Sequence, residues 1–232
     1  KAALFIVDAM EGTLLKSLEV EGVNGIANGL STPKLADYNA DGVADYAYAG
    51  DLQGNLWRFD LLRNGRSDTA PFTTEDDSEN AIDDFEVAFG GQPLFSAVAN
   101  TGTKGRQPIT SAPSLVLHPT GFGYLVVFGT GKFFETGDKE GDKSFAQTVY
   151  GIWDKQTLGE EASDPNIARS SLQEQTITTQ TTVEANGTTR QGLVLSNNNV
   201  SWQGSDTQAA QNGWFLNLRK SQGEMVVENM SQ

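Results

Sequence analysis

The sequence predicts an all-β fold, and three observations lead to this prediction. Apolar and polar residues alternate over short runs, the pattern of strands that bury one face. Gly, Asn and Asp bound these runs, as is typical of turns between strands. Helical spacing of apolar residues is scarce. The chain of 232 residues is 38% hydrophobic and 20% charged, so it is long and apolar enough to bury a core.

Each predicted element follows from one alternating run and the turn residues beside it. The first hairpin turns at residues 10–13, the second at 52–55 and the third at 119–123. The predicted hairpins cover residues 3–20, 44–62 and 113–134, and further strands are predicted over 148–160 and 212–227. Both ends of the chain, residues 1–9 and 223–232, are also predicted to be strands.

A weak internal repeat links these elements. Four apolar strands end in a polar residue and a short turn, with Asp8, Asp60, Asp154 and Asn217 near the strand ends. The repeats are spaced irregularly and further apart than the about 40–50 residues of regular propeller blades, and insertions would account for the excess. We therefore expect a modified β-propeller, complete or incomplete, with irregular surface insertions. A sandwich of unrelated β-hairpins is the alternative.

Two polar segments interrupt the strand pattern. Residues 1–232 are expected to form a single propeller domain or a fragment of one, with insertions near 64–84 and 158–190. Within the second insertion, residues 171–184 alternate with Thr and are predicted to form an edge strand. The acidic run from Glu75 to Glu79 is expected to be a solvated loop, because its carboxylates are not spaced to converge on one point.

Composition excludes several classes of function. The formal net charge of −14 argues against nucleic-acid binding and against docking on anionic lipid, and it suits the binding of hard cations. The absence of cysteine excludes disulfides, thiolate zinc sites and a cysteine nucleophile. The single histidine, His118, precedes a proline at the end of an apolar run and is expected to be an ordinary strand-end residue. No membrane-spanning run is visible, so no membrane insertion is expected.

Oxygen-bearing side chains recur in the segment DYNADGVAD, which runs from Asp37 to Asp45. Asp37, Asn39 and Asp41 occupy its first, third and fifth positions, and Asp45 occupies its ninth. Alternate side chains of a tight loop turn inward, and Ca²⁺ takes about six to eight oxygen ligands. The spacing therefore predicts a calcium site, to which these four side chains contribute.

The middle of the same segment completes the predicted cage. Gly42 can adopt a positive φ angle and let the chain turn sharply. The carbonyl of Val43 would point inward, which leaves its side chain free to be apolar. The pattern matches the first half of an EF-hand loop, but the position of the bidentate Glu holds Tyr48 and the flanks alternate like strands. The alternative is a polar turn without metal, because Asp, Asn and Gly are common turn residues.

The longest matching segments resemble a known family. ADYNADGVADYAYAGDLQGNLWRFDL, GRQPITSAPSLVLHP, VVFGTGKFFE and VYGIWDK are similar to the C-terminal domain of PilY-type proteins. These proteins are type IV pilus biogenesis factors and pilus-tip adhesins. The resemblance spans most of the chain, and GDLQGNLWRFDL and FGTGKFF are its most specific pieces.

The resemblance implies a modified β-propeller with one calcium site on a loop. The family's ligands correspond to Asp37, Asn39, Asp41, the Val43 carbonyl and Asp45. It implies a non-enzymatic role in pilus extension and retraction, twitching motility and surface attachment. The implied partners are pilins and minor pilins, with a host or abiotic surface as a further candidate. The implied location is extracellular, at the pilus tip or outer cell surface, after passage through the periplasm.

Other functions are less well supported by the sequence. A quinoprotein-like propeller dehydrogenase has similar blade ends, but its calcium ligands come from separate blades. An integrin-type propeller would carry several such loops, and this chain has one. A hydrolase is disfavoured by the single histidine and by the lack of a GxSxG motif.

Overall fold

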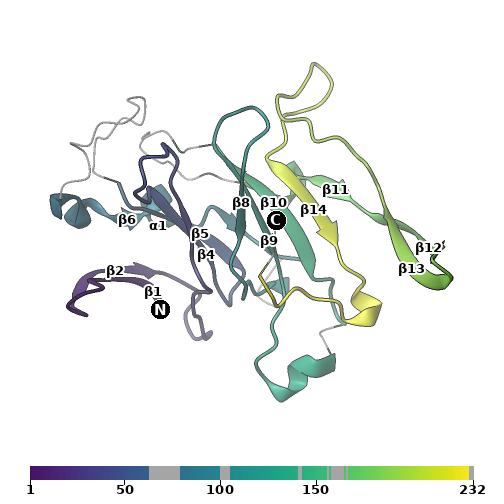
Figure 1. Cartoon of the computed structure of the whole chain (residues 1–232), viewed down its shortest axis with the longest axis horizontal. Helices are drawn as coiled ribbons and strands as arrows, with labels where there is room; N and C mark the ends of the chain where they lie inside the picture. Colours follow the sequence, from purple (N-terminus) through teal and green to yellow (C-terminus); the bar gives the residue numbers. More distant parts are fainter. Residues whose placement is uncertain are drawn as a thin grey trace.

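The computed structural model describes residues 1–62, 79–99, 105–140, 143–155, 157, 165 and 167–229. Within these residues the strands form two five-stranded sheets and two separate two-stranded hairpins (Figure 1). The all-β prediction is confirmed. The described residues form no closed ring of blades.

The first five-stranded sheet contains the second predicted hairpin. Its path runs β3–β4–β5–β6, and β7 also pairs with β5. The strands are β3 (Lys34–Ala36), β4 (Tyr46–Gly50), β5 (Asn55–Asp60), β6 (Glu86–Val87) and β7 (Phe95–Ser96). Every residue of β4 is buried, which shows that this sheet is covered on both faces.

The second five-stranded sheet contains the third predicted hairpin and runs in the order β11–β14–β10–β9–β8. Its strands are β8 (Ser114–Leu117), β9 (Tyr124–Gly129), β10 (Thr148–Asp154), β11 (Gln173–Gln175) and β14 (Gly213–Asn217). All its pairings are antiparallel except that of β11 with β14. The outer strand β11 comes from the segment that was predicted to form an edge strand.

Three layers explain the burial of the first sheet. One face, with Tyr46, Tyr48 and Leu56, packs on the second sheet in the main apolar core. The other face contributes Ala47, Ala49, Trp57 and Phe59 to a smaller core beneath the hairpin of β1 (Ala2–Val7) and β2 (Leu14–Val20). Stacked sheets of this kind match the expected arrangement of neighbouring propeller blades.

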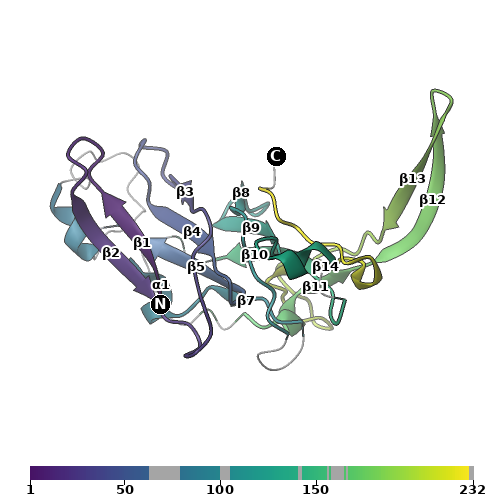
Figure 2. The same ribbon diagram turned by 90° about the horizontal axis from the view of Figure 1, so that it is seen from below.

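A second hairpin extends away from the stacked sheets. β12 (Ile177–Ala185) and β13 (Thr188–Leu195) form a two-stranded ribbon that projects from the body at the end opposite β1 and β2 (Figure 2). Its turn has positive φ at Asn186 and Gly187, the Asn-Gly pattern that suits a two-residue hairpin turn. The described part of the predicted insertion at 158–190 is therefore largely this ribbon.

The helical elements are single turns. The 3-10 turns cover Glu79–Asp84, Thr136–Glu140, Arg169–Ser171 and Lys220–Gln222, and α1 covers Ala88–Gly91. In α1, Phe89, Gly90 and Gly91 all have positive φ, so it is a left-handed turn rather than a regular helix.

Several residues that were predicted to lie in strands do not. Residues 130–134 and the described residues 223–229 lie outside any strand, as do residues 155, 157 and 218–222 of the other predicted strands. The apolar residues of 223–229 instead cover the second sheet: Val226 donates its N–H to Thr130 O at 2.9 Å, and its side chain fills the space beside Gly129.

A buried ionic network joins the two five-stranded sheets. Arg58 on β5 lies 3.0 Å from Asp154 on β10 and 2.7 Å from Asp60, and its side chain is 1% exposed. Tyr48 on β4 donates its hydroxyl to Asp154 at 2.8 Å. The Arg58 guanidinium also lies 4.3 Å from the centre of the Phe89 ring. Burial alone would lower the pKa of Arg58, but the two carboxylates raise it above its usual value, so the residue stays charged.

Candidate metal centre

The segment with the predicted calcium ligands connects β3 to β4. Ala36 and Tyr46 are paired across the two strands, so the loop from Asp37 to Asp45 closes an antiparallel hairpin. Asp45 donates its N–H to Ala36 O at 2.8 Å at the base of this loop. The structure thus brings all five predicted ligand residues into one loop, between a strand edge and the main core.

The first half of the loop is organised by its own side chains. Asp37 accepts hydrogen bonds from the N–H groups of Asp41 (3.1 Å) and Gly42 (2.9 Å). Asn39 Nδ2 donates to Asp41 Oδ2 at 2.8 Å, and Asp41 Oδ1 accepts the N–H of Val43 at 2.8 Å. Asp37, Asn39 and Asp41 are therefore linked to one another directly or through the loop backbone.

Asp45 anchors the base of the loop from inside the fold. It is 1% exposed, and its Oδ2 accepts the N–H groups of Tyr38 at 2.6 Å and Asn39 at 3.3 Å. Asp37 is exposed by contrast, and Asp41 is half-buried. The predicted ligands therefore span a gradient from a buried carboxylate to a solvent-facing one.

The backbone turns where the sequence predicts it. Gly42 has a φ of 94°, and a side chain there would meet no neighbouring atom within 4 Å. The predicted role of Gly42 in a sharp turn is confirmed. The side chain of Val43 is exposed, with 46% of its surface accessible. Ala40 also lies in the left-handed region, with a φ of 60°, and nothing in its residue type indicates this.

Two tyrosines hold the loop against the second sheet. Tyr124, at the start of β9, donates its hydroxyl to Asp37 O at 3.1 Å, and its ring meets Tyr38 edge-on with centroids 5.5 Å apart. Gly123 donates its N–H to the Tyr38 hydroxyl at 3.1 Å. Burial, with smaller contributions from Asp45 and Asp37, raises the pKa of Tyr124 to about 12. Sequence reasoning missed Tyr124, because its distance along the chain gives no signal of this contact.

The donor set of the loop suits a hard cation, and hydrogen bonds within the loop hold these donors close together. Among the described residues, no three His, Cys, Asp or Glu side chains converge in the arrangement of a ready metal cage. All candidate ligand atoms are oxygens, which suits Ca²⁺ rather than a thiophilic or imidazole-bound metal. The residues fit calcium in chemistry, because a carboxylate oxygen that accepts one N–H group keeps a second lone pair for a cation.

Comparison with known proteins shows the family of this chain. Residues 1–190 match the family model described as the PilY1 beta-propeller domain. The chain belongs to this PilY1 family. The resemblance to PilY-type proteins and the predicted propeller class are confirmed by this match.

Individual PilY1 proteins cover nearly all of the chain. "Type IV pilus biogenesis factor PilY1" of Pseudomonas aeruginosa PAO1 is 50% identical over 234 residues, which cover 99% of this chain and 20% of that protein. A PilY1 homolog from Xylella fastidiosa is 33% identical over 164 residues. The crystal structure of the Pseudomonas aeruginosa PilY1 C-terminal domain superimposes with a TM-score of 0.91 at 50% identity, covering 99% of this chain and 48% of that one. The chain thus spans a fifth of the length of the PAO1 protein.

His118 and the acidic run from Glu75 to Glu79 are the other residues that the sequence analysis considered. His118 is buried in the turn after β8, where its ring stacks on Trp153 at 3.8 Å and meets Trp202 edge-on at 4.3 Å. Glu79 lies in a 3-10 turn, whereas Glu75, Asp76 and Asp77 of the acidic run lie outside the described residues.

In the part of the chain that the structure describes, no helix combines the length and the apolar composition that crossing a bilayer requires.

Proposed function

We propose that this PilY1-family chain is a non-enzymatic, calcium-binding module of a type IV pilus biogenesis factor. The observation that carries the proposal is the loop between β3 and β4, whose side chains offer oxygen ligands at alternate positions around a glycine with positive φ. The match to PilY1 proteins supplies the link to the pilus. No observation in the described residues favours the quinoprotein-like dehydrogenase over this function.

Calcium would be held by the side chains of Asp37, Asn39, Asp41 and Asp45 and by the carbonyl of Val43. The ion would supply positive charge to a loop that carries three carboxylates. Ligand binding to the folded state stabilises it by RT ln(1 + [L]/Kd). Because Asp45 is buried at the base of the loop and Tyr124 holds Asp37 O, this stabilisation would be shared with the second sheet.

The consequence for the pilus is a change in the surface that the loop presents. Asp37, Gly42 and Val43 are exposed, so the ion would fix an outward-facing segment in one conformation. We infer that this segment adjusts contacts with pilins or minor pilins, and through them pilus extension and retraction, twitching motility and attachment to host or abiotic surfaces. The module would act outside the cell, at the pilus tip or outer surface, after passage through the periplasm.

Calcium titration of the metal-stripped chain by calorimetry tests the metal assignment. We expect one site in the wild type, and loss of that site in Asp37→Ala and in Asp45→Asn. The Asn substitution keeps the shape of the buried side chain but removes its charge. Asp8→Ala is the matched control, because Asp8 also accepts loop N–H groups, from Met10 and Glu11, in a turn remote from the site.

Two results would contradict the proposal. A wild type that binds no calcium would leave the loop as a polar turn, with the pilus role resting on the family match. Calcium binding that survives both loop substitutions would place the ion elsewhere. In cells, the same two substitutions should reduce the twitching zone, while Asp8→Ala should leave it unchanged.

A further inference from the structure

A second polar site lies apart from the calcium loop. A pocket of about 220 Å³ opens between the segment after β2, the turn between β4 and β5, and the segment after α1. Its walls include Glu21, Gln53, Asn55, Trp57, Gln92 and Arg106. It shares no residue with the loop of Asp37–Asp45, so its role is independent of calcium.

Arg106 is the unusual member of this pocket. Its Nη1 donates to Gln53 O at 3.1 Å, and its Nε is buried without a hydrogen-bond partner. Arg58 and Arg219 each pair with a carboxylate, whereas no such ion pair is formed by Arg106 with the described residues. The chain has 30 acidic and 16 basic residues, so a guanidinium without a carboxylate partner is unexpected. A buried polar atom left unpaired calls for an explanation, such as a bound group.

The chemistry of the pocket indicates the missing group. A guanidinium binds a carboxylate through charge-assisted hydrogen bonds, and Arg106 Nη1 carries a second N–H beside the one that it donates to Gln53 O. The amide of Gln92 can serve hydroxyl groups, and the volume is below the about 300–1,000 Å³ of drug-sized sites, which suits a single ring. We propose that this pocket binds the carboxylate-bearing sugar unit of an acidic polysaccharide, with Arg106 as the carboxylate ligand.

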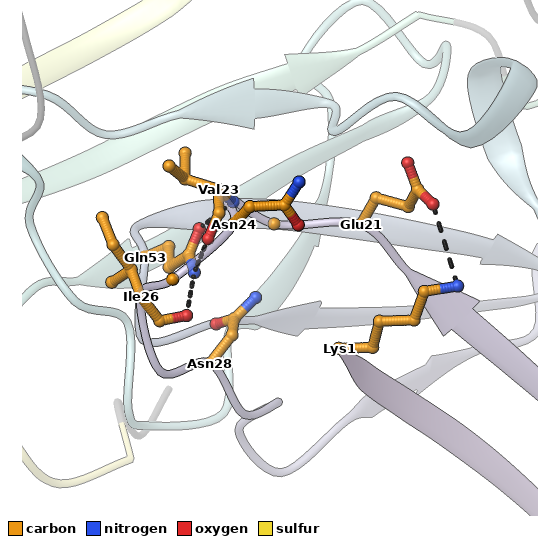
Figure 3. A pocket seen from close by; sticks show the side chains of 9 residues that line it. Lys1, Glu21, Val23, Asn24, Ile26, Asn28 and Gln53 are labelled. Carbon is orange, nitrogen blue, oxygen red and sulfur yellow. Dashed lines mark hydrogen bonds and ion pairs between the residues drawn. The ribbon is translucent and has the colours of Figure 1, made fainter.

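Adjoining pockets suit a chain of sugar units rather than a single one. A pocket of about 200 Å³ shares Glu21, Val23 and Gln53 with the first and adds Asn24 and Asn28 (Figure 3). On the other side, a pocket of about 310 Å³ shares Gln92 and Pro93. Three pockets of similar size therefore follow one another through common walls.

Two details of the walls bear on the choice of ligand. Glu21 would repel an anion, and Lys1, which lies 3.8 Å from its carboxylate, offsets only part of that charge because it also pairs with Glu19 at 3.0 Å (Figure 3). Gln53 is fully committed to the neighbouring backbone, because its side chain bonds Val23 N and Ile26 O at 2.7 and 3.0 Å. Gln53 therefore fixes the wall that the two pockets share.

An acidic peptide is the competing occupant of this pocket. Peptide grooves generally offer a strand edge or apolar anchors, whereas the lining of this pocket is mainly polar.

Titration of the metal-stripped, isotope-labelled chain with glucuronate, followed by NMR, tests the proposal. Glucose, acetate and an acetylated Asp-Asp peptide are the comparison ligands. We expect saturable shifts at Gly22, Gln92 and Arg106 with glucuronate, and much weaker effects with the other three. No saturable shift with glucuronate, an equal response to acetate, or tighter binding of the peptide would each overturn the proposal.

Substitutions assign the effect to the pocket. Arg106→Gln should weaken glucuronate binding about tenfold or more, because it removes a charge-assisted hydrogen-bond donor. Gln92→Glu, at an exposed position on the rim, should weaken it in the same direction without touching the core. Lys139→Gln lowers the net charge equally at a distant exposed site and should leave binding unchanged. Equal affinity of the wild type and both pocket variants would overturn the assignment.

Discussion

Asp51 shows how a single side chain can organise a turn from the inside. It is 0% exposed, and its carboxylate accepts hydrogen bonds from Gln53 N (2.9 Å), Asn55 N (2.8 Å) and Trp57 Nε1 (2.8 Å). The sequence predicts a turn at residues 52–55, directly after Asp51. The burial of Asp51 beneath Trp57 depends on the packing of a second layer and has no local signal.

Replacing Asp51 by Ala should destabilise the protein by about 3 kcal/mol, because several buried donors would lose their acceptor. Urea unfolding measures the change in free energy. Asp8→Ala is the control, since Asp8 accepts two backbone N–H groups in an exposed turn and should cost about 1 kcal/mol or less. Equal costs for the two variants would show that burial of the Asp51 acceptor contributes little.

His118 makes stability depend on pH through its aromatic surroundings. Burial, and to a lesser extent Lys155, lowers the pKa of His118 below its ordinary value of 6.5. The unfolded chain therefore takes up the proton at a higher pH than the folded protein. The resulting stability is fully present above a pH of about 6.5 and declines as the pH falls toward the folded-state pKa.

Comparison of the wild type with His118→Gln isolates this contribution. Unfolding free energies at pH 7.5 and pH 5.0 should fall more for the wild type than for the variant, although both also lose stability as carboxylates titrate. The charged group facing the imidazole cluster is Lys155, which lies 4.5 Å from the Trp153 ring. A wild type and variant with parallel pH dependence would mean that His118 titrates alike in both states.

At the scale of elements, the tight turn between β4 and β5 depends on one glycine. Gly54 has a φ of 83°, and a Cβ there would lie 2.7 Å from Gln107 O and 2.8 Å from Ala97 O. Both obstacles are backbone atoms of the segment that follows β7. The turn was predictable from its residues, but the close approach of a second chain segment was not.

Gly54→Ala should therefore destabilise the fold by about 3 kcal/mol, through backbone strain and overpacking together. Gly12→Ala is the matched control, because Gly12 has a similar φ of 70° with no neighbour within 4 Å. It should cost about 1–2 kcal/mol. Thermal unfolding of the two variants separates the two effects, and equal losses would argue against the steric contribution at Gly54.

The hairpins also show what sequence patterns can establish. β1–β2, β4–β5 and β8–β9 were predictable because alternation and turn residues act over a few neighbouring positions. The five candidate ligands lie within one short segment, so their position in one loop needs no long-range contact, and their role as ligands stays a prediction. The pairing of β10 with β14 and the contact of Tyr124 with the loop join distant segments. Such long-range contacts depend on how distant segments pack, and the residues next to each contact in the sequence give no signal of them.

At the scale of the whole molecule, the two large sheets are joined by charge as well as by apolar surface. Arg58 and Asp154 are separated by 96 residues in sequence, yet they form a buried pair between β5 and β10. Arg58 and Asp154 each stand among apolar residues, a pattern that predicts a strand but does not predict that the two side chains pair. The interface between the two sheets therefore contains an interaction that no local sequence pattern predicts.

Asp154→Asn should destabilise the chain by about 3–5 kcal/mol, because Arg58 would keep a buried charge with one of its carboxylates removed. Asp60→Asn, at a side chain that is 18% exposed, should cost less. Chemical denaturation of both variants checks the order. A larger loss of unfolding free energy in Asp60→Asn than in Asp154→Asn would contradict this prediction, because it would make the more exposed carboxylate the main partner of Arg58.

The stack of His118, Trp153 and Trp202 gives the protein an internal optical reporter. Trp153 Nε1 donates to Phe122 O at 2.9 Å, and the neighbouring Gly123 bonds to Tyr38 in the loop between β3 and β4. Indole emission depends on its immediate polar surroundings, so any movement of that loop would reach the fluorophore through one short turn. Changes at the loop could thus be followed in unlabelled protein by its own fluorescence.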